Sequence, residues 1–357
     1  MLVYWLIWGW ISILAFLDNK KLIFNFLFFI TIFFLAFFVG FRYEIGVDWN
    51  TYLMFYDTLK WYSLKDSVLF TDPMFGALNY WGNQLGFKDT LFVNSVCAFI
   101  LFYFFYFFSK KFKFKYVPLL VGYTYFIVVV SMNYVRQSVA VSISLLAMYY
   151  ALTEKKYSFL LLIFLATLFH KSAIILLVFF PLCFFSKIDL NKILNFFYII
   201  FSLFFITFIL YFSGSQGGNI YTDSDSEISS SGTLFRLFSH LVPMILYIRN
   251  RNEFKHNLKG NIVMLDYMFI LILYCFLLSF FYSTLADRFN LYLFFFDVYV
   301  YSFVCDRIDL RSRILLLVFI FIFYTSNFFV WFNFGTYALK GWIPYQNYII
   351  NFLSNTL

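Results

Sequence analysis

Four arginines stand where polar stretches of the sequence meet long apolar runs, at Arg42, Arg136, Arg236 and Arg288. A guanidinium group binds phosphate or carboxylate through several planar hydrogen bonds, and it stays charged when it is partly buried. A single arginine at such a position is more often an anchor for a lipid headgroup. Four of them, most within polar clusters, favour a common anionic ligand.

The first polar cluster runs from Gly40 to Tyr52 and contains Arg42, Glu44 and Asp48. Glu44 and Asp48 are four residues apart, so they share one face if the segment is helical. A carboxylate beside an arginine orients it or acts as a general base. The alternative interpretation is an interfacial turn in which these charges only form salt bridges.

A second cluster opens a long apolar run. Polar and small residues recur there at spacings of three and four, which places them on one face of a helix. They are Asn133, Arg136, Gln137, Ala140 and Ser144. Such a stripe is costly against lipid, so it predicts a cavity or a neighbouring helix on that side.

Two further clusters lie at predicted helix ends. His170 ends one apolar run, and Asp287 and Arg288 precede another, which contains Asp297. A lone histidine is commonly a satisfied structural residue, but the setting of His170 also suits a general base. The aromatic residues of the stretch Gly341–Tyr345 suit the membrane interface and could also stack on sugar rings.

The composition indicates which elements must position these side chains. Hydrophobic residues make up 63% of the 357 residues and charged residues only 12%, against about 25% in soluble domains. So few charges cannot cover a soluble enzyme, and so much apolar sequence excludes a disordered chain. We therefore predict an all-α, polytopic integral membrane protein with about twelve membrane-spanning helices, in a range of about ten to fourteen.

The predicted spans are apolar runs, several of them shorter than the roughly 20 residues that a crossing needs. They are Leu2–Leu17, Leu22–Phe41, Leu91–Ser109, Tyr116–Ser131, Tyr134–Leu152, Tyr157–Phe169, Ala173–Phe185, Ile193–Phe212, Leu234–Ile248, Ile262–Tyr282, Phe289–Cys305 and Ile314–Phe332. The stretch Tyr157–Phe185 is either one long bent helix or two short ones. The first run lacks a charged leader and a cleavage site, which predicts a retained helix.

The loops complete a single predicted transmembrane domain over residues 1–357. Residues 42–90 form a long external loop between the second and third spans, and its part Phe75–Leu85 looks amphipathic. Residues 213–233 form a second external loop, either a lid or a plain connection. Residues 333–357 form a tail, which we also expect outside.

Basic residues predict the orientation. With the N-terminus outside, most of the 26 Lys and Arg fall in cytoplasmic loops. The net charge of +8 is then mainly an orientation signal and a match to anionic membrane lipid, so we predict no nucleic-acid partner. Motifs of soluble enzymes are absent, the four cysteines have no CxxC spacing, and no acid pair demands a metal.

The ordered clusters resemble the EpsG family of Wzy-type polysaccharide polymerases. The resemblance covers roughly Phe41 to Tyr345. Four motifs carry it, with Pro344-Tyr345 in addition: Arg42…Gly46-Val47-Asp48…Tyr52, Arg136-Gln137…Ala140, Phe169-His170-Lys171-Ser172-Ala173 and Asp287-Arg288-Phe289…Tyr292.

The resemblance implies a glycosyltransferase of the multi-spanning, GT-C-like class. Such enzymes polymerise undecaprenyl-diphosphate-linked oligosaccharide repeat units, as donor and acceptor, at the outer face of the bacterial inner membrane. The product is an O-antigen, capsule or exopolysaccharide. The resemblance further implies no metal or other cofactor, and a chain-length regulator and a flippase as partners.

The candidate site residues fall into three sets. For the diphosphate they are Arg42, Arg136 and Arg288, with Arg236 as a weaker fourth, since rim arginines stabilise the charge on a leaving diphosphate. For the base they are Asp48, followed by His170 and Glu44. For the sugars they are Tyr52, Asn133, Gln137, Tyr292 and Tyr345.

Three alternatives remain open from the sequence. An O-antigen ligase would use the same donor with another acceptor. A flippase or exporter of lipid-linked sugars predicts a cationic path through the membrane and repeated halves, whereas these charges gather on one predicted face and no repeat appears. An acyltransferase built on His170 predicts access from the cytoplasm, whereas His170 is expected outside.

Overall fold

The computed structural model describes residues 1–18, 22–185, 192–215, 232–258 and 261–356. Over these residues the regular structure is helical and contains no β-strand, which confirms the all-α prediction. The chain divides into two compact units. Residues 1–142, 168–170 and 305–357 form the first unit, and residues 143–167 and 171–304 form the second.

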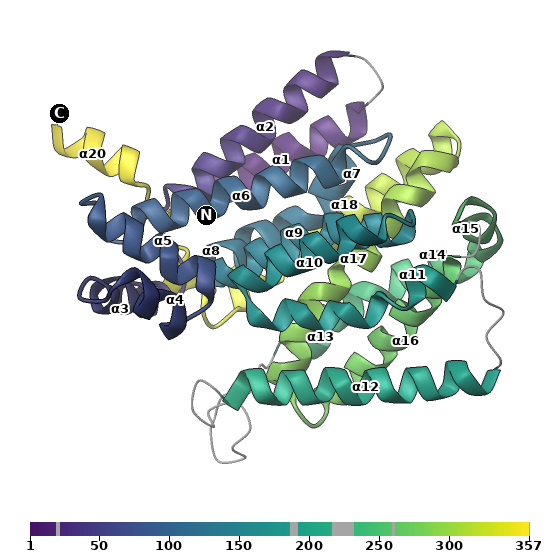
Figure 1. Ribbon diagram of the computed structural model, residues 1–357. Helices are drawn as coiled ribbons and strands as arrows, with labels where there is room; N and C mark the ends of the chain where they lie inside the picture. The colour runs from purple at the N-terminus through teal and green to yellow at the C-terminus, as the bar shows by residue number, and fades with distance from the viewer. Residues whose placement is uncertain (19–21, 186–191, 216–231, 259–260, 357) are drawn as a thin grey trace. The chain divides into compact units, whose positions relative to one another are not determined.

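The first unit holds the N-terminal helices, the first long loop and the C-terminal helices (Figure 1). Its elements are α1 (Leu2–Leu17), α2 (Leu22–Gly40), α3 (Trp49–Leu59), α4 (Leu64–Phe70), α5 (Pro73–Gln84), α6 (Leu91–Ser109), α7 (Tyr116–Gly122), the π-helix η1 (Tyr123–Val130), α8 (Ser131–Asn133), α18 (Leu310–Phe334), α19 (Ala338–Gly341) and α20 (Tyr348–Thr356).

The second unit takes most of the intervening chain. Its elements are α10 (Lys156–Phe169), the 3-10 helix η2 (Lys171–Phe179), α11 (Leu182–Phe185), α12 (Lys192–Ser215), α13 (Thr233–Leu237), the 3-10 turn η4 (Phe238–His240), α14 (Leu241–Arg249), α15 (Arg251–Leu258) and α16 (Ile262–Ser279). Two long helices, α9 (Val135–Leu152) and α17 (Ser283–Arg307), pass from one unit to the other, and the end of α10 belongs to the first unit.

Six helical stretches in the described residues are long and apolar enough to cross a membrane. They are Leu22–Gly40, Leu91–Ser109, Tyr116–Asn133, Val135–Leu152, Ile262–Ser279 and Leu310–Phe334. Shorter apolar helices cover Leu2–Leu17, Lys156–Phe169, Lys171–Phe184 and Phe197–Ile209. These helices make the chain a polytopic membrane protein, and the expected number of about twelve spans stays a prediction.

Burial distinguishes helices at the surface of the first unit from helices in its core. Only 22% of the apolar window of α18 is buried, whereas 89% of the window Tyr116–Asn133 is. Exposed apolar side chains on α2, such as Phe26, Phe29 and Phe33, suit contact with lipid chains. The stretch from α7 to α8 is therefore the most buried of the six candidate spans in the described residues.

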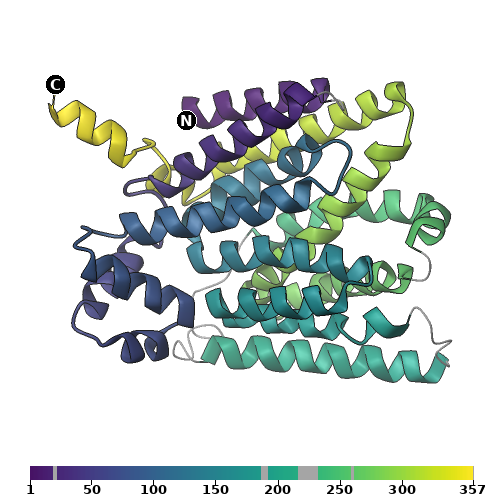
Figure 2. The same ribbon diagram turned by 45° about the horizontal axis from the view of Figure 1, so that its top comes forward.

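The helices α2 and α6 lie side by side (Figures 1 and 2). They come close because Gly40 has no side chain there. A Cβ atom at Gly40 would lie 3.0 Å from the Cα of Ser95 and 3.2 Å from the Cβ of Ala98. Small residues at a crossing let two apolar helices approach closely. The contact fixes the end of α2, from which the first long loop departs.

The first long loop is helical rather than irregular. It contains α3, α4 and α5, and α5 includes most of the predicted amphipathic stretch Phe75–Leu85. Gly76 of α5 lies against α4, where a Cβ atom would be 2.0 Å from the carbonyl oxygen of Ser67. Close packing of α4 on α5 therefore holds the loop in a defined shape.

The tail folds back onto the start of this loop. Arg42 and Asn347 form an isolated antiparallel bridge, and the amide of Gly46 donates to the carbonyl of Gly341 at 2.8 Å. Trp342 is 2% exposed, and its indole nitrogen donates to the carbonyl of Val128 in the π-helix at 2.9 Å. The predicted tail is thus part of the packed first unit.

Four local expectations need correction or completion. Glu44 has a positive φ of 53° and α3 begins only at Trp49, so Glu44 and Asp48 do not share a helical face. The predicted polar stripe is split at Tyr134, because Asn133 ends α8 while α9 begins at Val135. The stretch Tyr157–Phe185 is more than one helix, since α10 ends before His170 and η2 follows it. The second loop lies mostly at residues 216–231, outside the described residues.

Candidate functional site

Arg42 joins the ends of two helices in the first unit. Its Nη1 donates to the carbonyl of Val39 in the last turn of α2 at 2.7 Å, and its Nε donates to the carbonyl of Met132 in α8 at 3.1 Å. Its Nη2 donates to the side chain of Asn94 at 3.3 Å. A cation is favourable at a helix C-terminus, where unpaired carbonyls concentrate negative charge.

This setting changes the interpretation of Arg42. The residue is 1% exposed, and burial lowers the pKa of its guanidinium to about 10, which leaves it charged at neutral pH. Each guanidinium nitrogen donates to a protein acceptor. In this geometry Arg42 presents no open surface to a substrate phosphate, and it supports the site as a cap on two helices.

Asp48 and Asn133 bind each other reciprocally. The amide of Asp48 donates to the Asn133 side-chain oxygen at 3.0 Å, and the Asn133 side-chain nitrogen donates to the Asp48 carboxylate at 3.2 Å. Gly46 makes this approach possible, because it has a φ of 105° and a Cβ atom there would lie 2.4 Å from the carbonyl of Met132. The first predicted base is thus half-buried and engaged with α8, while Glu44 is exposed.

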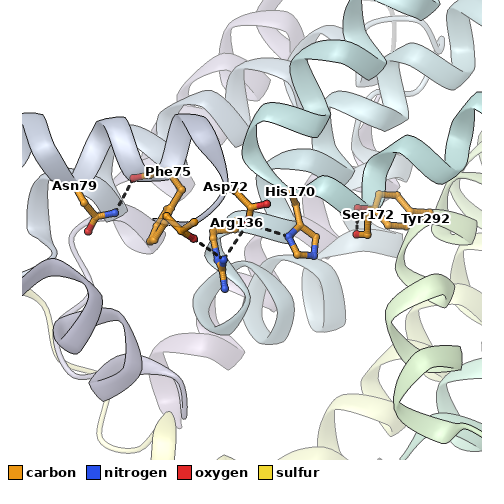
Figure 3. Close-up of polar contacts among 8 residues, drawn as sticks. Asp72, Phe75, Asn79, Arg136, His170, Ser172 and Tyr292 are labelled. Atoms are coloured by element: carbon orange, nitrogen blue, oxygen red, sulfur yellow. Dashed lines mark hydrogen bonds and ion pairs between the residues drawn. The ribbon is translucent and has the colours of Figure 1, made fainter. Parts of the chain in front are cut away.

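Asp72, Arg136 and His170 form a charged cluster in the first unit (Figure 3). The Asp72 oxygen Oδ2 lies 2.9 Å from Arg136 Nη1 and 3.3 Å from His170 Nδ1. Arg136 also donates to the hydroxyl of Thr71 at 3.0 Å. The side chain of Asp72 is 5% exposed, whereas those of Arg136 and His170 are 27% and 18% exposed. A buried carboxylate therefore holds a cation and an imidazole that both reach the surface.

Aromatic rings surround the Arg136 guanidinium. Its central carbon lies 5.6 Å from the ring centre of Phe55 and 5.4 Å from that of Phe75, within the range of cation–π attraction. The Tyr52 side chain also interacts with Arg136, and burial raises the pKa of the Tyr52 hydroxyl, which keeps it neutral. The helices α3 and α5 of the first loop thus shape the surroundings of an arginine that begins α9.

Two other predicted sugar-binding residues of this unit face the interior. Gln137 is 4% exposed and follows Arg136 on α9. The hydroxyl of Tyr345 donates to the carbonyl of Phe38 at 2.8 Å and accepts from Asn347 at 3.0 Å. In this conformation Tyr345 helps to attach the tail to α2.

The second unit holds the remaining predicted residues. Arg236 of α13 donates from Nε to Asp287 of α17 at 2.6 Å, and the hydroxyl of Tyr292 lies 2.9 Å from that of Ser172. Arg288 is half-buried on α17. Asp287 and Arg288 lie inside a helix rather than at its end, because α17 begins at Ser283, before the predicted start of that span at Phe289.

The second unit also contains a buried pair that the sequence signalled only in part. Asp297 was recognised as a carboxylate within an apolar run, but its partner was not. His240 lies 2.7 Å from Asp297 through Nδ1, and its Nε2 contacts the side-chain oxygen of Asn290. Both members of the pair are 1% exposed. Buried charges need such a partner because isolated burial is costly.

The structure brings together six predicted residues in the first unit: Arg42, Asp48, Tyr52, Asn133, Arg136 and His170. Arg236, Arg288 and Tyr292 belong to the second unit. In the charged cluster of the first unit, Asp72 is the residue that sequence reasoning missed. Its signal in the sequence is the pair Asp72-Pro73, which is typical of the start of a helix and does not by itself indicate a site.

No group of three or more His, Cys, Asp or Glu side chains suited to a metal ion occurs in the part of the chain that the structure describes. The four cysteines are buried, as expected for small apolar side chains. The predicted independence from metals and cofactors stays a prediction.

The model of the EpsG family matches residues 25–347, which is most of the chain. This family is associated with glycosyltransferase-like polysaccharide polymerases. Comparisons with curated proteins and with solved structures give no significant match. The family match includes the whole first long loop, the start of α9 and His170, and it ends at Asn347.

Proposed function

The chain belongs to the EpsG family, and on that basis we propose that it polymerises undecaprenyl-diphosphate-linked repeat units into a surface polysaccharide. In this proposal the growing chain leaves its lipid diphosphate and is joined to the non-reducing end of the next lipid-linked unit. The enzyme works at the outer face of the bacterial inner membrane, needs no metal or other cofactor, and cooperates with a flippase and a chain-length regulator.

One observation carries the assignment of the site: Arg136 and His170 share the carboxylate of Asp72, and both are partly exposed. Glycosyl transfer from a lipid diphosphate needs two groups within reach of one sugar. It needs a base for the acceptor hydroxyl and a cation for the leaving diphosphate. An imidazole and a guanidinium held on one carboxylate supply both.

The proposed step is a single displacement at the anomeric carbon of the donor. His170 accepts the proton of the acceptor hydroxyl, whose oxygen forms the new glycosidic bond. The bond between the anomeric carbon and the diphosphate oxygen breaks, and the electron pair goes to the diphosphate. Arg136 stabilises the charge that develops there, which is typically the largest contribution a site of this kind makes.

The geometry changes the order of the candidate bases. Asp48 was the first choice from sequence, but it is bound to Asn133 through both its amide and its carboxylate. We therefore propose His170 as the base and give Asp48 the role of holding α3 against the end of α8. Tyr52, which interacts with Arg136, is the proposed sugar contact of this unit. Arg236, Arg288 and Tyr292 remain proposed substrate contacts of the second unit.

The test is deletion of the gene followed by gel analysis of the surface polysaccharide. Loss of the polymer ladder with accumulation of single repeats on the lipid carrier supports the proposal. If the polymer on the lipid carrier is normal but none of it is transferred to its final acceptor, the protein is a ligase. Failure of lipid-linked repeats to reach the outer face indicates a flippase, and either of these results refutes polymerisation.

Variants then test the assigned residues. His170→Gln should lower the rate of polymerisation by about 100-fold or more, the usual contribution of a general base. Arg136→Lys should lower it by about 100-fold because a lysine lacks the planar fork. Matched controls are His256→Gln and Arg249→Lys, which change exposed residues of the second unit and should leave the ladder intact. A normal ladder from His170→Gln at normal expression would exclude His170 as the base.

A further inference from the structure

Asp72 departs from the usual behaviour of an aspartate at the start of a helix. It precedes α5, yet its side chain makes no capping hydrogen bond to that helix. Two other helix starts in the first unit have such a cap: Ser63 accepts from the amide of Asp66, and Asp309 accepts from the amide of Ser312. Asp48 at the start of α3 has no such cap and binds Asn133 instead. The carboxylate of Asp72 is instead directed at the neighbouring α9 and at the end of α10.

A single oxygen of this carboxylate has two charged or chargeable partners. Asp72 Oδ2 accepts from Arg136 Nη1 at 2.9 Å and lies 3.3 Å from His170 Nδ1, and the side chain is almost fully buried. Figure 3 shows Asp72 between the two. A charge-assisted bond to a guanidinium is strong, so the two partners compete for the same negative charge. Any change in the charge at Arg136 therefore changes how strongly Asp72 stabilises a positive charge on His170.

We infer that Asp72 is a positioning residue that couples the binding of the donor diphosphate at Arg136 to the readiness of His170 to accept a proton. The inference rests on the proposed function and adds a residue to which the sequence reasoning gave no role. Asp72 itself touches neither substrate. It acts by holding the Nδ1 proton of His170, which leaves the lone pair of the neutral imidazole on Nε2.

The coupling follows from simple electrostatics. Without donor, the positive charge of Arg136 balances much of the negative charge of Asp72. When a diphosphate binds Arg136, whose side chain is partly exposed, it neutralises that cation. The Asp72 carboxylate then stabilises a positive charge on His170 more strongly, because a nearby opposite charge favours the charged form. The imidazole thus becomes a better proton acceptor when the donor is in place.

The test uses nitrogen-15 NMR of the full-length protein in nanodiscs with labelled histidine. The chain has three histidines, so the signals of His170 can be assigned with His170→Gln. The probe is undecaprenyl diphosphate, with binding verified independently by tryptophan fluorescence. In the wild type, the lipid should raise the titration midpoint of His170 by about 1 pH unit.

The variants separate coupling from a merely structural contact. Asp72→Asn should lower the His170 midpoint in the lipid-free protein by about 1 pH unit and abolish the response to the lipid. Asp72→Glu keeps the charge and should restore part of the response. Asp57→Asn, which changes an exposed aspartate of the same loop, should behave as the wild type.

The results distinguish this inference from the proposed function. Bound lipid with no change at His170 in the wild type overturns the coupling, and this measurement needs no variant to fold. An unchanged His170 midpoint in Asp72→Asn also overturns it. A polymer ladder that persists in His170→Gln, with the coupling observed, overturns the assigned base and leaves the electrostatic link between Asp72 and His170 in place.

Discussion

The change Arg42→Met tests whether this arginine is a helix cap or a substrate ligand. Methionine keeps much of the apolar stem but removes three hydrogen bonds, to Val39, Met132 and Asn94. Each buried acceptor left without its donor costs about 1–3 kcal/mol. The variant avoids the cost of burying a cation, which offsets part of this loss. We therefore expect a net loss of about 3–5 kcal/mol of folding free energy.

The assay is thermal unfolding of the purified full-length protein in detergent, followed by tryptophan fluorescence. A loss of that size should lower the midpoint by about 5–15 °C. The unfolding midpoint of Arg42→Lys should lie between those of the wild type and Arg42→Met, because a lysine can reach one carbonyl but not three acceptors. Arg249→Met, at an exposed arginine, is the control and should leave the midpoint unchanged.

The opposite result would refute this reasoning. If Arg42→Met unfolds at the wild-type temperature but no longer binds undecaprenyl diphosphate, the guanidinium is a ligand and the capped geometry does not describe the working enzyme. If the variant is destabilised but still binds the lipid, the capping role stands.

Three further predictions concern other parts of the chain. Gly46→Ala should cost about 1–3 kcal/mol of stability from backbone strain, and more from contact with the carbonyl of Met132. Gly86→Ala, also at positive φ but in open space, should cost only the strain. Thermal unfolding of the two variants compares these losses. Burial raises the pKa of Asp18 from 3.8 to about 6. Its contribution to stability is therefore full below about pH 4 and is lost as the pH rises through 6, which lowers the unfolding midpoint of the wild type over this range. The unfolding midpoint of Asp18→Asn should lack this dependence on pH. His240→Ala should lower stability by about 3–5 kcal/mol because it leaves the buried charge of Asp297 unpaired, and the same melts should show a much smaller loss when the change is combined with Asp297→Asn.

Much of the fold follows from the amino-acid sequence because apolar length alone specifies a membrane helix. The predicted runs Leu22–Phe41, Leu91–Ser109, Ile262–Tyr282 and Ile314–Phe332 are helices close to their predicted bounds. Local breaks are harder to predict. Hydropathy does not mark where the α-helix Tyr116–Gly122 passes into the π-helix Tyr123–Val130, since both lie in one apolar run. The exchange of one hydrogen-bonding pattern for another depends on partners distant in sequence, such as Trp342.

Site residues could be predicted from the sequence where a polar or charged side chain stands at the edge of an apolar run. Arg136 and His170 stood out because a charge or an imidazole at the edge of an apolar run needs a reason. Asp72 did not, because an aspartate before a proline is ordinary at a helix start, and its departure from capping is visible only in three dimensions. The surroundings of Arg42 were not predictable for the same reason, since sequence marks a cation but not whether helix carbonyls surround it.

The return of residues 341–348 onto residues 41–46 has a consequence for biogenesis. The ribosome makes the two partners of this contact about 300 residues apart, and at roughly 5–20 residues per second the first waits for the second for many seconds. During that interval the segment that carries Asp48 has already been inserted but cannot take its final form. An insertion intermediate that stops before Gly341 is therefore expected to leave its first loop open to proteases, and protection of that loop would report the moment at which the first unit closes.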